Sequence, residues 1–97
     1  MSVSNNLMSD MRAVLRINHD MYDDEISALI EAAKTDLRIG GISPSKTEDE
    51  NDALIKRAIT TYVKAEFGLD NADAEKYRAA YQAIRTRLML SSEYREG

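Results

Sequence analysis

The side chains best suited to chemistry lie in one short stretch, where the only histidine of the chain, His19, is followed closely by Asp20, Asp23 and Asp24. Imidazole and carboxylate groups are metal ligands, so a cation could in principle bind there. A calcium-binding loop, however, needs oxygen ligands at alternate positions, a central glycine and a terminal glutamate, and this stretch lacks that pattern. A helix N-terminus explains the same carboxylates, because they favour the positive end of the helix dipole. We therefore expect no metal site.

The other polar residues do not form the patterns that catalysis or cofactor binding requires. General acid–base catalysis needs a titratable pair held in a pocket, whereas the carboxylates fall mostly on helix faces that we expect to be exposed. No serine has a histidine on a neighbouring element to activate it, unless His19 is recruited from its polar turn. Gly40-Gly41 is not a phosphate-binding loop, since no lysine and hydroxyl residue follow at the required spacing. We expect no catalytic residues and no cofactor.

The composition is that of one folded domain. The chain has 97 residues, of which 43% are hydrophobic and 31% charged, which suits a small single core. It has no cysteine, and therefore no disulfide or thiol chemistry. No apolar run approaches the roughly 20 residues that span a bilayer, and residues 1–6 lack the features of a signal peptide. We expect a single domain over residues 1–97 that stays in the cytoplasm where it is made, with no membrane partner.

Helical periodicity divides the first half of the chain into two amphipathic segments. We expect Ser9 to cap a short first helix that ends at Ile17. The second helix is expected from about Tyr22 to Ile39, with Asp20 as its cap and Gly40-Gly41 at its end. Its buried stripe has the spacing i, i+3, i+4, i+7, i+11: Ile26, Leu29, Ile30, Ala33 and Leu37.

The second half predicts two more helices. After a loop with the only proline, Thr47-Glu48-Asp49-Glu50 matches a capping box, so a third helix is expected to start near Glu48 and to stop at Gly68. Asn71 is expected to cap a last helix that runs to about Leu90. The sequence therefore predicts an all-α fold, a small bundle of about four helices, with flexible tails at residues 1–6 and 91–97.

Aromatic and apolar residues near the end of the chain indicate a surface for another subunit. Three tyrosines are expected at the rim of the core, half-buried with their hydroxyls in water: Tyr62, Tyr77 and Tyr81. Tyr94 lies beyond the last helix, and because tyrosine is enriched at binding hot spots we expect it to anchor a contact with a partner. Leu88 ends the apolar stripe predicted for the last helix, but Leu88, Met89 and Leu90 are consecutive, and no single helix face can bury all three. At least one of them is expected to be covered by a partner.

The charges are distributed unevenly, with a formal net charge of −4. From Asn18 to Asp52 ten acidic residues face three basic ones, whereas from Ala74 onward five basic residues face three acidic ones. Solvated helix faces explain this division, but so does contact between the acidic end of one copy and the basic end of another. An acidic chain disfavours tight, direct DNA binding, because phosphate contacts need clustered lysine and arginine.

Several segments, in their order along the chain, resemble the phage head–tail connector family, the small helical adaptor or head-completion proteins of long-tailed phages and prophages. The resemblance covers the chain from about Leu7 to Tyr94. Each segment is an ordinary amphipathic helix with a cap, so the resemblance depends on their order and spacing. They are Met11 to Asp20 with the acidic helix start after it, Leu29 to Lys34, Tyr62 to Gly68, and Glu75 to Tyr94.

This resemblance implies a bundle of α-helices that assembles as a homo-oligomeric ring, commonly twelvefold in the family, beneath the portal protein of a filled capsid. The ring would extend the DNA channel, with DNA passing through it without sequence-specific binding. It would also offer a docking surface for the tail or for a head-closure protein. The expected location is therefore the virion, at the head–tail interface, and the family has no catalytic residues to carry over.

A closed ring of identical subunits needs two different, complementary surfaces on each subunit. We expect an acidic edge to meet a basic edge on the next subunit. The interface residues that we expect are Asp23, Asp24 and Glu25 on the acidic edge, Arg78, Arg85 and Arg87 on the basic edge, and Leu88, Met89 and Tyr94.

A different interpretation is a small helical DNA-binding module, such as the recognition subunit of a packaging enzyme or a transcriptional regulator. Two helices joined by a glycine turn are similar to a helix-turn-helix. A recognition helix, however, needs lysine and arginine at its start, whereas the last helix opens with Asn71-Ala72-Asp73-Ala74-Glu75. An enzyme would depend on His19 and its acidic neighbours alone.

Overall fold

The computed structural model describes residues 3–68 and 71–95, and the secondary structure of these residues is helical. The all-α fold predicted from the sequence is confirmed. Four helices are long, and one is a single turn. Their bounds are α1 (Asn5–Val14), α2 (Asp23–Ile39), α3 (Pro44–Thr47), α4 (Ala53–Glu66) and α5 (Ala74–Leu90). The described residues add one isolated antiparallel β-bridge, between Ile42 and Arg95.

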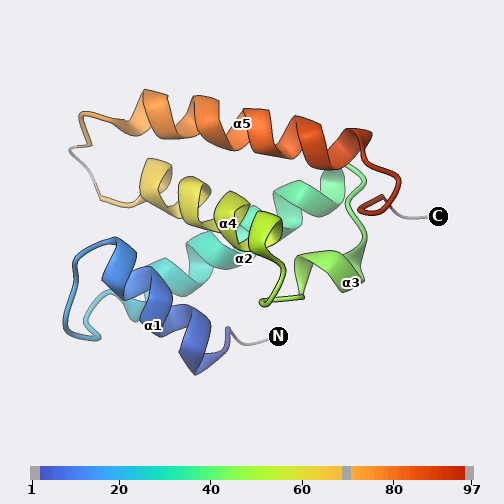
Figure 1. The fold of residues 1–97 in the computed structure, drawn as a ribbon. Coiled ribbons are helices and arrows are strands. Elements are labelled where there is room, and N and C mark those ends of the chain that lie inside the picture. Colours follow the sequence, from blue (N-terminus) through green and yellow to red (C-terminus); the bar gives the residue numbers. More distant parts are fainter. Residues whose placement is uncertain (1–2, 69–70, 96–97) are drawn as a thin grey trace.

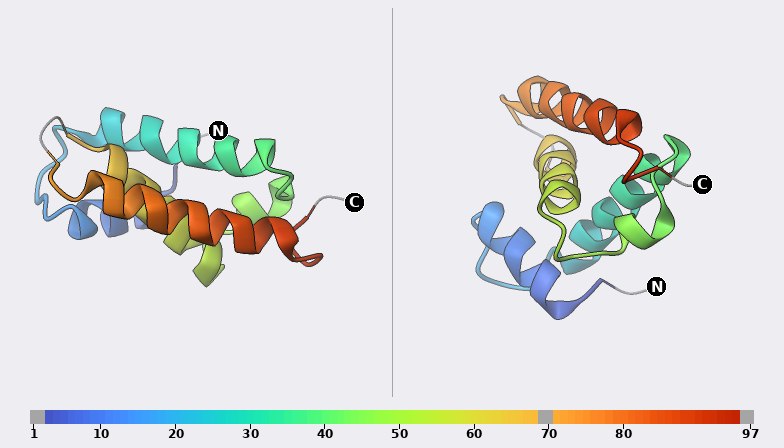
Figure 2. Two further views of the ribbon diagram at one scale, coloured as in Figure 1. Left: turned by 90° about the horizontal axis from the view of Figure 1, so that it is seen from above. Right: turned by 45° about the vertical axis from the view of Figure 1, so that its right-hand side comes forward.

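α4 lies at the centre of the bundle. α5 lies on one side of it, and α1 and α2 lie on the other (Figures 1 and 2). Its buried residues recur at helical spacing: Ile55, Ala58, Ile59, Val63 and Ala65. All but Ala65 pack on apolar residues of the surrounding helices, including Met11, Ile30, Leu37 and Tyr81, in one continuous core. Within the described residues, no helix is both long enough and apolar enough to cross a membrane.

α1 begins earlier than the sequence predicted. Its cap is Ser4, not Ser9, and the Ser4 hydroxyl accepts a hydrogen bond from the Leu7 amide at 3.0 Å. The earlier start brings Leu7 and Met8 into the core beside Met11. A helix of this length is marginal alone, so these three side chains hold it in place. Part of the expected N-terminal tail is therefore helical, and residues 1–2 lie outside the described part.

α2 covers the expected span, but Asp20 does not cap it. The N-cap residue is Tyr22, which makes no side-chain capping bond. The first turn gains its stability from carboxylates near the helix dipole instead. At the other end Gly40 is right-handed, with φ −74°, and Gly41 adopts the left-handed conformation, with φ +100°.

The capping box predicted at Thr47 is wrong. Pro44 starts a single helical turn, as proline does at the first position of a helix, and Thr47 ends that turn. The Thr47 side chain is buried and its hydroxyl donates to the Pro44 carbonyl at 3.0 Å. Asp52 caps α4 instead, because its carboxylate accepts from the amides of Leu54 and Ile55 at 3.0 and 3.1 Å.

Asn71 does not cap α5 but links it to α4. Its side-chain nitrogen Nδ2 donates to the Lys64 carbonyl at 2.6 Å, and its side-chain oxygen Oδ1 accepts from the backbone amide of Asp73 at 3.1 Å. α5 then begins at Ala74, with Asp73 at the N-cap position. The tight link expected at Leu69-Asp70 lies outside the described residues.

Residues 91–95, expected to be part of a flexible tail, form a turn that packs on the bundle. The Ser43 amide donates to the Tyr94 carbonyl at 2.8 Å, and the Tyr94 side chain is only 8% exposed. Residues 96–97 lie outside the described part. The turn joins the end of α5 to the connection between α2 and α3.

Candidate interaction surfaces

The acidic edge expected at the subunit interface is the first turn of α2. Asp23 accepts a hydrogen bond from Arg12 Nε at 2.8 Å, and this bond lowers the pKa of the Asp23 carboxyl below its ordinary value. Asp23 therefore joins α2 to α1. Asp24 and Glu25 are exposed and make no ion pair with the residues described. These two carboxylates are the part of the acidic edge that is free for a partner.

Two of the three α5 arginines expected at the basic edge have partners inside the subunit. Arg78 pairs with Glu66 and Glu75, at 2.9 Å each. Arg85 Nη2 donates to the Asp36 carbonyl at 3.1 Å, which binds α5 to α2. Arg85 Nε also lies 3.0 Å from the Asp36 carboxylate, but it is too poorly aligned for a hydrogen bond, so the carbonyl bond is the directional contact. Arg87 is exposed, with no ion pair to any described residue.

The apolar part of the expected interface lies largely inside the subunit. Leu88 is 1% exposed because it continues the buried stripe of α5, and the turn after α5 brings Tyr94 back onto the core. Both side chains are unavailable to a partner in this conformation. The burial of Leu88 agrees with the stripe predicted for the last helix, whereas the burial of Tyr94 corrects its expected place on the surface. Met89 is half-buried and Leu90 is 79% exposed. An interface role for Met89 stays a prediction.

The three tyrosines expected at the rim of the core differ in depth. Tyr62 and Tyr77 are half-buried, as predicted, but Tyr81 is 3% exposed and donates its hydroxyl to the Asp36 carboxylate. Burial, and then the bond to Asp36, raise the pKa of Tyr81 above its usual range. Asp36 thereby binds both Tyr81 and Arg85, one turn apart on α5. The sequence did not point to Asp36, since no local pattern marks it.

Two adjoining hollows on the outer side of α4 bring together basic residues that the sequence analysis did not single out. The first, of about 530 Å³, lies between α4 and the start of α5. The second, of about 540 Å³, shares Lys64 and Tyr77 with the first and extends to Arg16. No aspartate or glutamate lines either hollow. We call the two together the basic groove, with the basic residues Arg16, Lys56, Arg57, Lys64 and Lys76.

Most of the positive charge in the basic groove is free. Lys56 pairs with Asp10 at 2.6 Å, and the Lys64 ammonium lies 4.5 Å from the centroid of the Tyr77 ring. Lys64 and the other three groove residues form no ion pair within residues 3–68 and 71–95. Part of this signal was visible in the sequence, because α4 carries three basic residues and no acidic one before Glu66. Arg16 and Lys76 lie outside α4, and only the fold brings their positive charges to the groove.

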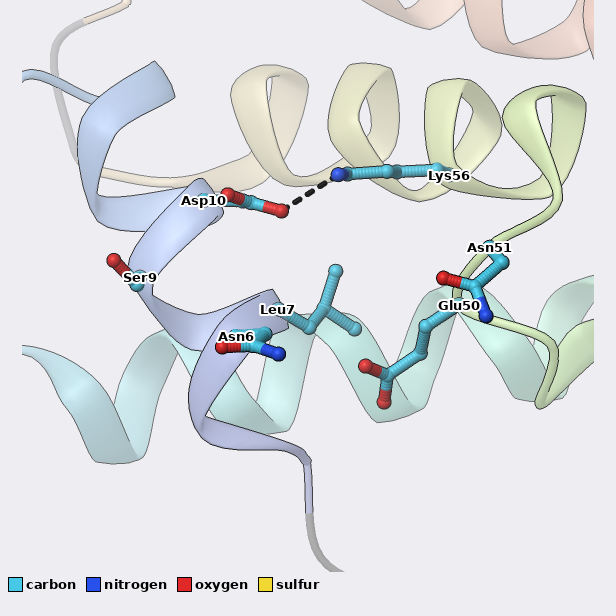
Figure 3. A pocket seen from close by; sticks show the side chains of 7 residues that line it. All are labelled: Asn6, Leu7, Ser9, Asp10, Glu50, Asn51 and Lys56. Carbon is cyan, nitrogen blue, oxygen red and sulfur yellow. Dashed lines mark ion pairs between the residues drawn. The ribbon is translucent and has the colours of Figure 1, made fainter.

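A polar hollow of about 330 Å³ lies where α1 meets the segment before α4 (Figure 3). Figure 3 shows the Asp10–Lys56 ion pair across it, with Glu50 on the opposite wall. The Ser4 hydroxyl donates to the Glu50 carboxylate, so the cap of α1 is itself held by the segment before α4. These contacts hold α1 in position.

His19 has a structural partner. Its Nδ1 accepts from the Met21 amide at 3.3 Å, and its ring lies 5.5 Å from that of Tyr22. In the part of the chain that the structure describes, no three histidine, aspartate or glutamate side chains are grouped closely enough to hold a metal ion. The contacts of His19 support the turn before α2.

A comparison with known protein families identifies the family to which this chain belongs. Residues 7–95 match the family model described as phage connector protein. The chain belongs to the phage connector family. No curated protein and no solved structure matches it. The family resemblance drawn from Leu7 to Tyr94 is confirmed, and this connector is a structural component of a phage particle. Asp24 and Glu25 on α2 and most of the basic groove residues form no ion pair with the residues described.

Proposed function

We propose that this connector assembles as a ring beneath the portal of a filled capsid, extends the DNA channel and joins the head to the tail. The observation that carries the proposal is the family match, which covers residues 7–95. The surface chemistry supports it, because each subunit of a ring must offer two different, complementary surfaces. In this connector they are the free cations of the basic groove and the free carboxylates of α2.

The partners follow from this role. Copies of the connector contact one another around the ring, commonly twelvefold in the family. One side of the ring meets the portal protein, and the other meets the tail or a head-closure protein. DNA passes through the centre without sequence-specific binding. The protein is made in the host cytoplasm and ends in the virion at the head–tail interface.

The direct test mixes the purified connector with purified portal rings. Negative-stain electron microscopy and native mass spectrometry should find a closed ring of connector copies on each portal. In a phage that lacks the connector, heads should fill with DNA and then fail to acquire tails. A connector that never associates with the portal, together with normal tailed particles in its absence, would contradict the proposal.

The basic groove also favours a second candidate, the small helical DNA-binding module. Its free lysines and arginines could contact phosphates. The start of α5 does not suit a recognition helix, because it presents Asp73 and Glu75. A gel-shift assay at low salt separates the two functions, since sequence-preferring binding supports the DNA-binding module and its absence supports the connector ring.

A further inference from the structure

We infer that the basic groove receives the outer face of α2 from a second copy of this chain. The outer face of α2 is its exposed side near the N-terminus, formed by Asp24, Glu25 and Ala28 together with Met21, which lies two residues before the helix begins. The inference rests on the proposed ring and names the two surfaces that meet between neighbouring subunits.

Charge supports this pairing. The groove offers Arg16, Arg57, Lys64 and Lys76, which have no ion-pair partner among the described residues. Asp24 and Glu25 likewise have no such partner. Complementary charges of this kind steer association and fix which surfaces meet. The pairing also replaces the arginines of α5 as the basic side of the contact, because Arg78 and Arg85 are already paired within the subunit.

The floor of the groove favours a protein helix over a nucleic acid. It contains Ala53, Ala80 and the ring of Tyr77, all of which are apolar. The outer face of α2 offers Ala28, whose small side chain allows close approach of another helix, and Met21, which is 78% exposed. A phosphate backbone would satisfy the cations of the groove but would leave this apolar floor uncovered.

The positions of the two surfaces suit a repeating contact. α2 and α4 pack against each other through their buried stripes, so their outer faces point in opposite directions. α4 lies in front of α2 in Figure 1, and in the left view of Figure 2, seen from above, α2 runs along the top of the picture with α4 below it. Surfaces on opposite sides of a subunit form head-to-tail contacts, which close into a ring when the rotation between copies permits it.

Charge reversal tests the pairing. Arg57→Glu/Lys76→Glu changes the groove, and Asp24→Lys/Glu25→Lys changes the face of α2. All four residues are exposed and lack ion pairs to described residues, so thermal unfolding should show that each variant folds. Each reversal alone should abolish the ring on the portal, as measured by native mass spectrometry. The two reversals combined in one chain should restore it. Arg95→Glu is the matched control, because Arg95 is exposed and lines neither hollow of the groove, and it should assemble like the unmodified protein.

Cross-linking provides a second measurement, because the chain has no cysteine of its own. Ala28→Cys/Thr61→Cys places one thiol on α2 and one in the groove of each copy. A short bismaleimide should join neighbouring copies of the portal-bound protein into a covalent ladder. Ala28→Cys/Thr86→Cys moves the second thiol to the far half of α5 and should give no ladder.

The outcomes separate this inference from the proposed function. Reversal variants that form normal rings would overturn the pairing and leave the connector ring intact. An unmodified protein that forms no ring on the portal would overturn both. If Arg57→Glu/Lys76→Glu assembles normally but loses affinity for duplex DNA in fluorescence anisotropy, the groove binds nucleic acid and the pairing is wrong.

Discussion

The phenol of Tyr94 donates a hydrogen bond to the carboxylate of Asp52 across 2.9 Å, although 42 residues separate the two. Asp52 accepts at the same time from the first amides of α4. The Lys46 ammonium lies 5.0 Å from the centroid of the Tyr94 ring. The C-terminal turn therefore supports the cap of the central helix, and this relationship makes the end of the chain part of the fold.

Removal of the Tyr94 hydroxyl should weaken the fold. Tyr94→Phe keeps the ring in the core but removes a bond to a charged acceptor, which should lower the free energy of unfolding by about 1.5–3 kcal/mol. Urea unfolding followed by circular dichroism measures the change. Tyr22→Phe is the control, since Tyr22 is 44% exposed, and it should change stability by less than about 0.5 kcal/mol. Equal effects for the two variants would contradict the structural role of Tyr94.

Stability should fall at both ends of the pH range. Burial alone would raise the pKa of Asp52, but hydrogen bonds from Ile55, Tyr94 and Leu54 outweigh it and hold the pKa below its ordinary value of 3.8. The Asp52 contribution is therefore complete above about pH 4 and is lost as the pH falls through the folded pKa. Burial, and then the bond to Asp52, raise the pKa of Tyr94 from 10.0 to about 12. This contribution is complete below pH 10 and is lost as the pH rises toward 12.

Unfolding free energies of the unmodified protein and of Tyr94→Phe, measured from pH 7 to 12, check the alkaline side of this prediction. The difference between the two proteins should shrink above pH 10, where the unfolded tyrosine ionises first. A difference that stays constant would contradict the raised pKa of Tyr94.

Substitution of Glu48 should lower the stability of the fold more than substitution of its ion-pair partner Lys34. The Lys34 side chain is 1% exposed and its ammonium lies 2.8 Å from Glu48, which also pairs with Arg38. Glu48→Ala leaves a buried cation with only the longer contact to Glu31 and should cost about 3 kcal/mol. Lys34→Met replaces the cation with an apolar chain of similar size and should cost less than about 1 kcal/mol.

Denaturant unfolding measures both of these substitutions. The double variant Lys34→Met/Glu48→Ala should be more stable than Glu48→Ala alone, because it removes the unpaired charge. A less stable double variant would show that the ion pair contributes by attraction and that burial of the lone cation costs little.

Substitution of Gly40 or of Gly41 by alanine should lower the stability of the fold, for a different reason at each position. A Cβ atom on Gly40 would lie 2.8 Å from Arg85 Nη2, so Gly40→Ala should displace the Arg85 bond to Asp36 and cost about 1 kcal/mol. Gly41 has open space around it but a positive φ, so Gly41→Ala should cost about 1 kcal/mol through the backbone. In an Arg85→Ala background the Gly40→Ala cost should largely vanish, whereas the Gly41→Ala cost should remain. Thermal unfolding of the three single variants and the two double variants checks this comparison.

Helical periodicity predicted the long helices because it depends on residues within one element. Of the predicted stripe of α2, Ile26, Ile30, Ala33 and Leu37 are fully buried, and Leu29 is partly buried against the core. The caps were predicted less well, since serine, threonine, aspartate and asparagine are common and the point where a helix starts depends on what it packs against. Thr47 illustrates this, because Pro44 begins a helical turn that takes Thr47 out of the cap position.

The candidate interface could be predicted only in part, because a charge count does not reveal which charges are already paired. Arg85 belongs to the basic end of the sequence, yet it binds Asp36, 49 residues away. Arg57 and Lys76 were not among the interface residues expected from the sequence, yet the fold brings both to one hollow whose lining contains no carboxylate.

By itself, the sequence determined that this chain forms amphipathic helices around one small core and that it resembles the connectors of phage particles. Both conclusions depend on the spacing of residues along the chain, which can be read without knowledge of distant contacts. Only the tertiary structure decided that Tyr94 lies inside the subunit and that the free positive charge lies along α4. Those outcomes depend on which distant residues meet, because a charge or an aromatic ring is available to a partner only when no residue of its own chain already covers it.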